Sequence, residues 1–182
     1  MKMFIVLLTI LLLCGATIIP EKSASFWKKA DKNLERIFKG ETLTKKGVEF
    51  GEKELSKNDM PFVNNGIYQL FHDKELLGYL VLTASMGRYE SFDYMVVYDL
   101  ELTVKEIDVL NYTSSHGGEV ASKKWLKQFV GYNGKHLKYG TDIEAITGAT
   151  YSAGSLTKDL ESITNLLKKN KALISKSGLD GF

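Results

Sequence analysis

The stretch from residue 67 to residue 112 constrains the fold most, because apolar segments follow one another there with only short polar turns between them. A turn of four polar residues, 72–75, separates the first two segments and is too short for a crossover helix, so it predicts a hairpin. In the third segment Phe92, Tyr94, Val96 and Tyr98 alternate with other residues and share one face. The segments, at 67–71, 76–84, 91–98 and 105–112, predict an antiparallel sheet.

Three amphipathic stretches predict helices that flank this sheet. They cover residues 26–38, 119–130 and 152–170, and the last repeats apolar residues at a helical spacing: Leu156, Leu160, Ile163 and Leu167. Weaker patterns predict short strands at 48–50 and 143–146. The fold class that follows is α+β, a single domain with a twisted antiparallel sheet and one face covered by helices.

Composition fits one globular domain and excludes one large class of partner. The chain has 182 residues, 44% of them hydrophobic, which is enough for a substantial core. Formal net charge is +2, with acidic and basic residues interspersed. A nucleic-acid-binding surface needs a concentrated basic face, so no nucleic-acid partner is expected.

The N-terminus has the pattern of an export signal. Lys2 precedes an apolar run, and the small residues 23–25 follow it, so residues 1–25 are expected to be a signal peptide or an uncleaved membrane anchor. Leu13 before Cys14 disfavours lipid attachment. The protein is then periplasmic, or attached to the membrane and facing outside the cytoplasm. Cys14 is the only cysteine, so the domain at 26–175 has no disulfide or thiolate metal ligand. Residues 176–182 are expected to be a flexible tail.

A turn of small residues leads into the last predicted helix. Behind the short strand, the sequence runs Thr147, Gly148, Ala149, Thr150, Tyr151 and Ser152. A strand, a tight turn and a helix N-terminus place backbone N–H groups and hydroxyls where an anion such as a phosphate is favoured. The plainer interpretation is an ordinary helix cap, since Thr and Ser are common capping residues.

These residues, together with Glu144, resemble the flavinylation motif of the FMN-binding domain family. That family includes the covalently flavinylated subunits of sodium-pumping NADH:quinone reductases and of Rnf-type electron-transfer complexes. Its motif has an acidic residue, two variable positions, Ser or Thr, and then Gly-Ala-Thr. Thr147, Gly148 and Ala149 match it, and Thr150 is at the acceptor position. Glu144 replaces the usual Asp and keeps the carboxylate.

The resemblance implies that FMN is joined to Thr150 by a phosphoester. A threonine hydroxyl does not take up a phosphoryl group unaided, and no histidine or paired carboxylate lies near Thr150 in the sequence. The family implies a separate magnesium-dependent flavin transferase, which uses FAD and releases AMP. The protein would then be an electron carrier rather than a stand-alone enzyme, with membrane or extracytoplasmic electron-transfer proteins as partners.

The similarity extends over residues 66–167. The loop with His116, followed by a helix that ends in Phe129, Val130 and Gly131, is similar to the layout in the family. On this basis His116 is also expected to bind the cofactor, because its loop would contact the flavin ring. The complete set is Thr150, Thr147, Gly148, Ala149, Tyr151, Ser152, Glu144 and His116.

Other residues give weaker indications. His72, His116 and His136 lack the spacing of metal ligands, so no metal site is expected, and no G-x-S-x-G nucleophile motif occurs. Tyr89, Tyr94 and Trp125 have the chemistry to stack on a flavin, although core packing is the commoner role of such residues. Two alternatives to the covalent carrier stay open: an exported binding or scaffold domain without flavin, and a reductase with noncovalent FMN.

Overall fold

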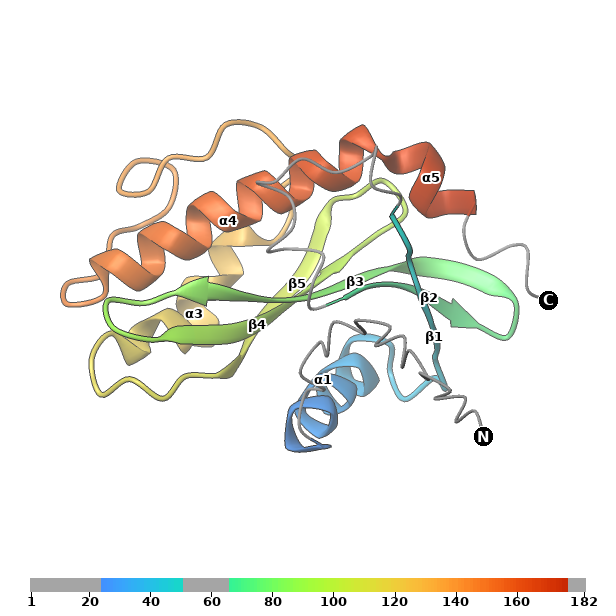
Figure 1. Ribbon diagram of the computed structural model, residues 1–182, viewed down its shortest axis with the longest axis horizontal. Helices are drawn as coiled ribbons and strands as arrows, with labels where there is room; N and C mark the ends of the chain where they lie inside the picture. The colour runs from blue at the N-terminus through green and yellow to red at the C-terminus, as the bar shows by residue number, and fades with distance from the viewer. Residues whose placement is uncertain (1–23, 51–65, 177–182) are drawn as a thin grey trace, which may run out of the picture.

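The computed structural model describes residues 24–50 and 66–176 and shows a single five-stranded antiparallel sheet (Figure 1). The strands lie in the order in which they occur in the chain, β1-β2-β3-β4-β5, so each pairs with its neighbour in sequence. This arrangement confirms the α+β prediction. The bounds are β1 (Thr44–Gly47), β2 (Ile67–His72), β3 (Glu75–Met86), β4 (Ser91–Tyr98) and β5 (Val104–Asn111).

Helices cover both faces of the sheet, whereas the sequence pattern predicted cover on one face. Helix α1 (Ala24–Ile37) packs on one face, and the long helix α4 (Thr150–Lys169) crosses the other (Figure 1). The remaining helical segments are η1 (Gly118–Ala121), α3 (Lys123–Leu126), η2 (Lys127–Phe129) and α5 (Lys171–Lys176). Within residues 24–50 and 66–176, no helix has both the length and the apolar character of a membrane span.

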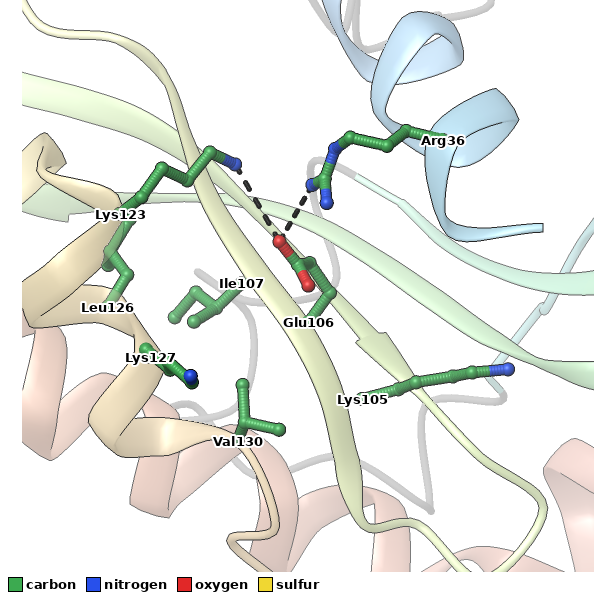
Figure 2. A pocket seen from close by; sticks show the side chains of 8 residues that line it. All are labelled: Arg36, Lys105, Glu106, Ile107, Lys123, Leu126, Lys127 and Val130. Carbon is green, nitrogen blue, oxygen red and sulfur yellow. Dashed lines mark hydrogen bonds and ion pairs between the residues drawn. The ribbon is translucent and has the colours of Figure 1, made fainter. Parts of the chain in front are cut away.

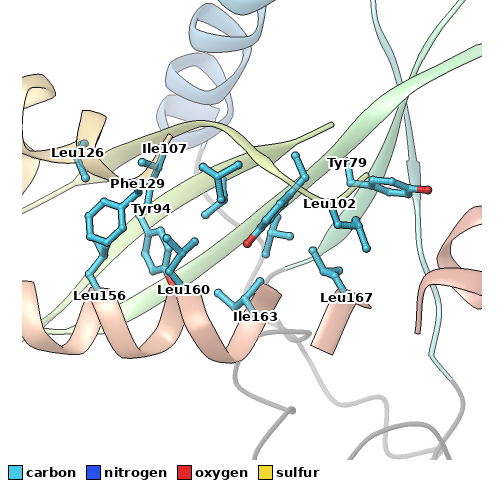
Figure 3. Close-up of a cluster of buried hydrophobic side chains, with 14 of the residues drawn as sticks. Tyr79, Tyr94, Leu102, Ile107, Leu126, Phe129, Leu156, Leu160, Ile163 and Leu167 are labelled. Carbon is cyan, nitrogen blue, oxygen red and sulfur yellow. The ribbon is translucent and has the colours of Figure 1, made fainter. Parts of the chain in front are cut away.

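The larger core lies between the sheet and α4. Leu156, Leu160 and Ile163 of α4 are fully buried against Tyr94 of β4 and Phe129 of η2 (Figure 3). Burial of a large apolar side chain contributes about 1.5–3 kcal/mol, so several such contacts along one helix hold it firmly. The N-terminus of α4 therefore has a fixed position relative to the strands.

The smaller core lies between the sheet and α1. Phe26 and Leu34 of α1 are buried against Leu80, Met95 and Val97. Met95 and Val97 alternate with residues that face α4, so β4 is buried on both faces. An exposed sheet face would have required polar residues at these positions.

Two of the weaker strand predictions are wrong. The first strand is at 44–47 instead of 48–50, although the N–H of Val48 still donates to the Ile67 carbonyl at 2.8 Å. At 143–146 there is no strand but only an isolated parallel bridge between Tyr139 and Ile143.

The prediction of one continuous helix at 119–130 is also wrong. Ser122 is extended (φ −72°, ψ 133°) and separates η1 from α3. Its side chain accepts a hydrogen bond from the N–H of Trp125 and caps α3, a local bond that competes with helix continuation. The predicted stripe of Trp125 and Phe129 is nevertheless buried, because both rings still face the core.

Some sequence-based expectations lie outside the described residues. These are the signal or anchor at 1–25, apart from its last two residues, and the tail from residue 177 onward.

Candidate functional site

A cavity of about 300 Å³ lies at the end of the sheet where three segments meet. These are the β3–β4 turn, the loop after β5, and the N-terminus of α4, which come together at the left of Figure 1. Six of the eight residues expected from the sequence line it. The lining consists of Arg88, Tyr89, His116, Gly148, Ala149, Thr150, Tyr151 and Ser152.

The N-terminus of α4 is not capped by a side chain. Gly148 has a φ of +82°, a conformation that favours glycine, and the chain turns there into the helix. The N-cap residue is Ala149, which has no side chain that accepts hydrogen bonds, so the ordinary hydroxyl cap does not form. The first backbone bond of the helix runs from Ala153 to the Ala149 carbonyl, at 2.9 Å. The N–H groups of the first turn thus have no acceptor from a side-chain cap, and they carry the positive end of the helix dipole.

Thr150 is the first residue of this helix, and its side chain is exposed at the cavity. Within the described part of the chain, its hydroxyl has no hydrogen-bond partner. The neighbouring Tyr151 ring is 65% exposed. A reagent or enzyme can therefore approach the Thr150 hydroxyl from solvent.

Ser152 is buried and connects α4 to the loop after β5. The Tyr112 hydroxyl donates to the His116 carbonyl at 2.6 Å and lies 3.0 Å from Ser152 Oγ. Because its single proton goes to the carbonyl, Ser152 is the donor in the second bond. Gly117 (φ +78°) fits closely here, since a Cβ on it would lie 2.8 Å from the Tyr112 hydroxyl. These contacts fix the position of His116 beside the cavity.

The β3–β4 turn approaches α4 through Gly87. A Cβ on Gly87 would lie 2.8 Å from the Glu90 carbonyl and 3.2 Å from Ser152 Oγ. Only glycine lets the turn come this close without a shift of its neighbours. The approach brings the next residue, Arg88, to the cavity.

Arg88 is the site residue that the sequence motif did not indicate. Its guanidinium lies 5.5 Å from the ring centre of Tyr89 and 5.6 Å from that of Tyr151, distances typical of cation–π contacts. Its position one residue after a hairpin glycine was the available signal. Arg88 supplies a permanent positive charge beside Thr150.

Glu144 and Thr147 do not line the cavity, although both are exposed. The backbone of Glu144 fixes the preceding segment: its N–H donates to Gln128 Oε1 and its carbonyl accepts from Trp125 Nε1, both at 2.8 Å. Glu144 therefore connects the turn to the α3–η2 segment through its main chain.

Of the aromatic candidates, only Tyr89 is at the cavity. Tyr94 and Trp125 are buried in the core, as packing residues are.

A partly buried hydrogen bond between a serine and a carboxylate joins β3 to α4. Ser85 donates to Asp159 Oδ2 at 2.6 Å and joins β3 to the middle of α4. Burial raises the pKa of Asp159, and the Ser85 hydrogen bond partly opposes this change. Burial, and then the charge of Asp159, raise the pKa of Tyr94, so this phenol is neutral.

The histidines are dispersed over the molecule. His72 contacts the Thr42 carbonyl at 3.2 Å, and His136 contacts Glu161 Oε1 at 3.1 Å. Over the described ranges, no group of three or more His, Cys, Asp or Glu side chains is placed to hold a metal ion.

No family model matches the chain, and no curated protein matches it. Among solved structures, it is similar to the crystal structure of Shewanella oneidensis NqrC, with 17% identity and a TM-score of 0.49. The match covers 67% of this chain and 68% of that one.

Proposed function

We propose that the protein is an exported electron carrier that bears FMN in a phosphoester with Thr150. One observation carries the proposal: an exposed threonine hydroxyl begins an uncapped helix at the edge of a cavity that also contains an arginine. The motif that residues 144–150 resemble supports it, since its acceptor threonine corresponds to Thr150.

The residues at the cavity fit the phosphate end of such a group. The N–H groups of Thr150, Tyr151 and Ser152, which no side chain caps, are hydrogen-bond donors, and Arg88 supplies a full positive charge. A hydrogen bond to a charged group contributes about 1.5–3 kcal/mol, so a few such bonds position a phosphate well. Among the described residues, no carboxylate lines the cavity to oppose it.

The remainder of FMN would contact the exposed aromatic rings around the cavity. Tyr89 and Tyr151 offer flat surfaces, and His116 offers polar contacts from the loop fixed by Tyr112. When bound, the isoalloxazine ring accepts one or two electrons. The protein's contribution is to bind and orient the ring.

Attachment requires a second protein. A magnesium-dependent flavin transferase would use FAD: a bond forms between Thr150 Oγ1 and the FMN phosphorus as the pyrophosphate bond breaks, AMP leaves, and the hydroxyl proton passes to the transferase. The chain has no base in hydrogen-bond contact with Thr150 among its described residues, in keeping with catalysis in trans. Exposure of Thr150 gives the transferase access.

Covalent attachment would be useful in an exported protein. The apolar N-terminal segment is typical of export, and a flavin outside the cytoplasm that dissociates is lost. A phosphoester keeps it in place.

The intact mass of the full chain, co-expressed with a flavin transferase, tests the proposal. We expect a gain of one FMN residue that is absent in Thr150→Ala. Yellow protein without a mass gain, whose flavin is released by denaturation, would indicate a noncovalent reductase instead. Colourless protein of unmodified mass would indicate a scaffold domain.

A further inference from the structure

A second cavity, of about 490 Å³, lies along β5 on a different part of the molecule (Figure 2). It is bounded by α1 on one side of the strand and by α3 and η2 on the other. The lining residues are Arg36, Lys105, Glu106, Ile107, Lys123, Leu126, Lys127 and Val130. None of them belongs to the Thr150 site.

Three residues of the lining of this cavity are apolar. Ile107 points from β5 toward Leu126, and Val130 lies next to them (Figure 2). Ile107 and Leu126 are buried, whereas Val130 is 46% exposed. An apolar group that covered Val130 would gain the free energy of its burial.

The charges around the cavity are unbalanced. Arg36 and Lys123 reach Glu106 from opposite sides of β5, at 2.7 and 3.7 Å (Figure 2), and both also pair with Asp108. Lys105 and Lys127 have no acidic partner within the described ranges. Lys105 instead lies 4.6 Å from the ring centre of Phe38. Four cations thus face two carboxylates.

The excess of positive charge affects the protonation of one of the lysines. The pKa of Lys123 is lowered, first by burial and then by repulsion from Arg36. A bound anion would relieve this repulsion.

Lysines at a sheet edge often serve only to prevent edge-to-edge pairing, and β5 is an edge strand of this sheet. That role requires charge but no apolar cavity. Ligand sites combine apolar residues with a few polar or charged groups, and the volume of this cavity lies in their usual range.

We propose that this cavity binds a small organic carboxylate with an apolar body. The body would lie against Val130, with Ile107 and Leu126 behind it. The carboxylate would be attracted by Lys127 and by Lys105, whose ammonium lies over the Phe38 ring in this structure. The proposal does not depend on FMN attachment.

Calorimetric titration of the full chain at low ionic strength tests this inference. The probes are naphthoate, a flat aromatic carboxylate, and naphthamide, its neutral analogue. We expect naphthoate to bind about tenfold more tightly, which corresponds to two favourable surface charge interactions. The backbone amides of Ile107, Leu126 and Val130 should shift in NMR spectra on addition of naphthoate.

The double variant Lys105→Gln/Lys127→Gln should lose this preference for naphthoate. Lys124→Gln is the matched control, because Lys124 is an exposed lysine of α3 outside the cavity lining, and it should keep the preference. Equal binding of naphthoate and naphthamide to the unmodified chain would contradict the proposal. So would an undiminished preference in the double variant. Binding of hexaglutamate but not of naphthoate would identify a patch for acidic protein segments and also overturn it.

Discussion

Thr150 and Ser152 are two residues apart on the same helix, yet their hydroxyls differ in what they can do. Ser152 is 3% exposed and is bonded to Tyr112, whereas Thr150 is exposed and unbonded within the described structure. A modifying enzyme needs an accessible hydroxyl that is free of internal bonds. Of these two hydroxyls, only that of Thr150 meets both conditions.

Arg88 should accelerate flavin attachment, because it places a positive charge where the phosphate arrives. We expect Arg88→Gln to reduce the initial rate of flavinylation about tenfold, the loss of roughly one charge-assisted hydrogen bond. Flavin absorbance per protein, followed over time with purified transferase, measures the rate. Arg88→Lys keeps the charge but not the planar group, so its rate should lie between those of the unmodified protein and Arg88→Gln. An unchanged rate in Arg88→Gln would show that Arg88 does not assist flavin attachment.

Asp159 should make stability depend on pH in a defined direction. Burial raises its pKa in the folded state, so the folded protein holds this proton more tightly than the unfolded chain does. Stability from this group is therefore full below the unfolded pKa, ordinarily 3.8, and is lost as the pH rises through the folded pKa. Asp159→Asn avoids the loss and can still accept the Ser85 hydrogen bond.

Urea unfolding at several pH values checks this prediction. The midpoint of Asp159→Asn should exceed that of the unmodified protein at pH 7, and the difference should shrink as the solution is acidified. A difference that grows on acidification would show that the ionised carboxylate stabilises the fold.

At the scale of elements, the site depends on how closely the β3–β4 turn approaches α4. Gly87, Arg88 and Ser152 belong to segments more than sixty residues apart in sequence, and the hairpin geometry brings them together. Helix α4 itself is held by its buried apolar face, so the turn must adapt to the helix.

Substitution of Gly87 should therefore damage the site more than substitution of other glycines nearby. We expect Gly87→Ala to destabilise the protein by about 1–3 kcal/mol, because its Cβ would overlap the Glu90 carbonyl and crowd Ser152. Flavinylation should fall with it. Gly118→Ala is the control, since a Cβ there meets nothing within 4 Å. Similar unfolding midpoints for the two variants would contradict the close-approach explanation.

The elements that the sequence predicted well are those whose pattern is local. Alternating residues and short turns located β2 to β5, and helical spacing located α4. The position of the first strand was not predicted, because its residues, Thr44 to Gly47, are mostly polar, as suits an edge strand. The break at Ser122 was not predicted either. It depends on a hydrogen bond from the Trp125 N–H to the Ser122 side chain, and hydrophobic periodicity does not reveal such a bond.

The site could be predicted only where its residues are contiguous. The turn at 147–152 was visible as a motif, and five of its residues line the cavity. Arg88 reaches the cavity through the hairpin, and this proximity depends on tertiary packing. The uncapped state of α4 also had to be observed, since Thr and Ser nearby suggested a cap.

At the scale of the whole molecule, two separate cores stabilise one sheet. The α4 core supports the Thr150 site, and the α1 core supports the opposite face. Strand β4 contributes to both, so the two layers should unfold together.

Leu34→Ala tests this coupling. Leu34 is buried in the α1 core, and its truncation should cost about 2–5 kcal/mol, the usual range for leucine in a core. Urea unfolding followed by tryptophan fluorescence and by circular dichroism should give coincident, shifted transitions. The fraction that is still folded should accept flavin normally, because Leu34 does not reach the cavity. Two separate transitions would show that the layers unfold independently.

The most direct test of the central claim is to locate the flavin on the chain. Trypsin cleaves after Lys138 and Lys158, so one peptide, 139–158, contains Thr147, Thr150 and Ser152. Fragmentation of this peptide, from full chain flavinylated by a transferase, should assign the FMN mass to Thr150 and to no other hydroxyl. Thr147→Ala should keep the modification and Thr150→Ala should lose it. An FMN mass on Thr147 or Ser152, or an unmodified peptide from protein exposed to active transferase and FAD, would contradict the account.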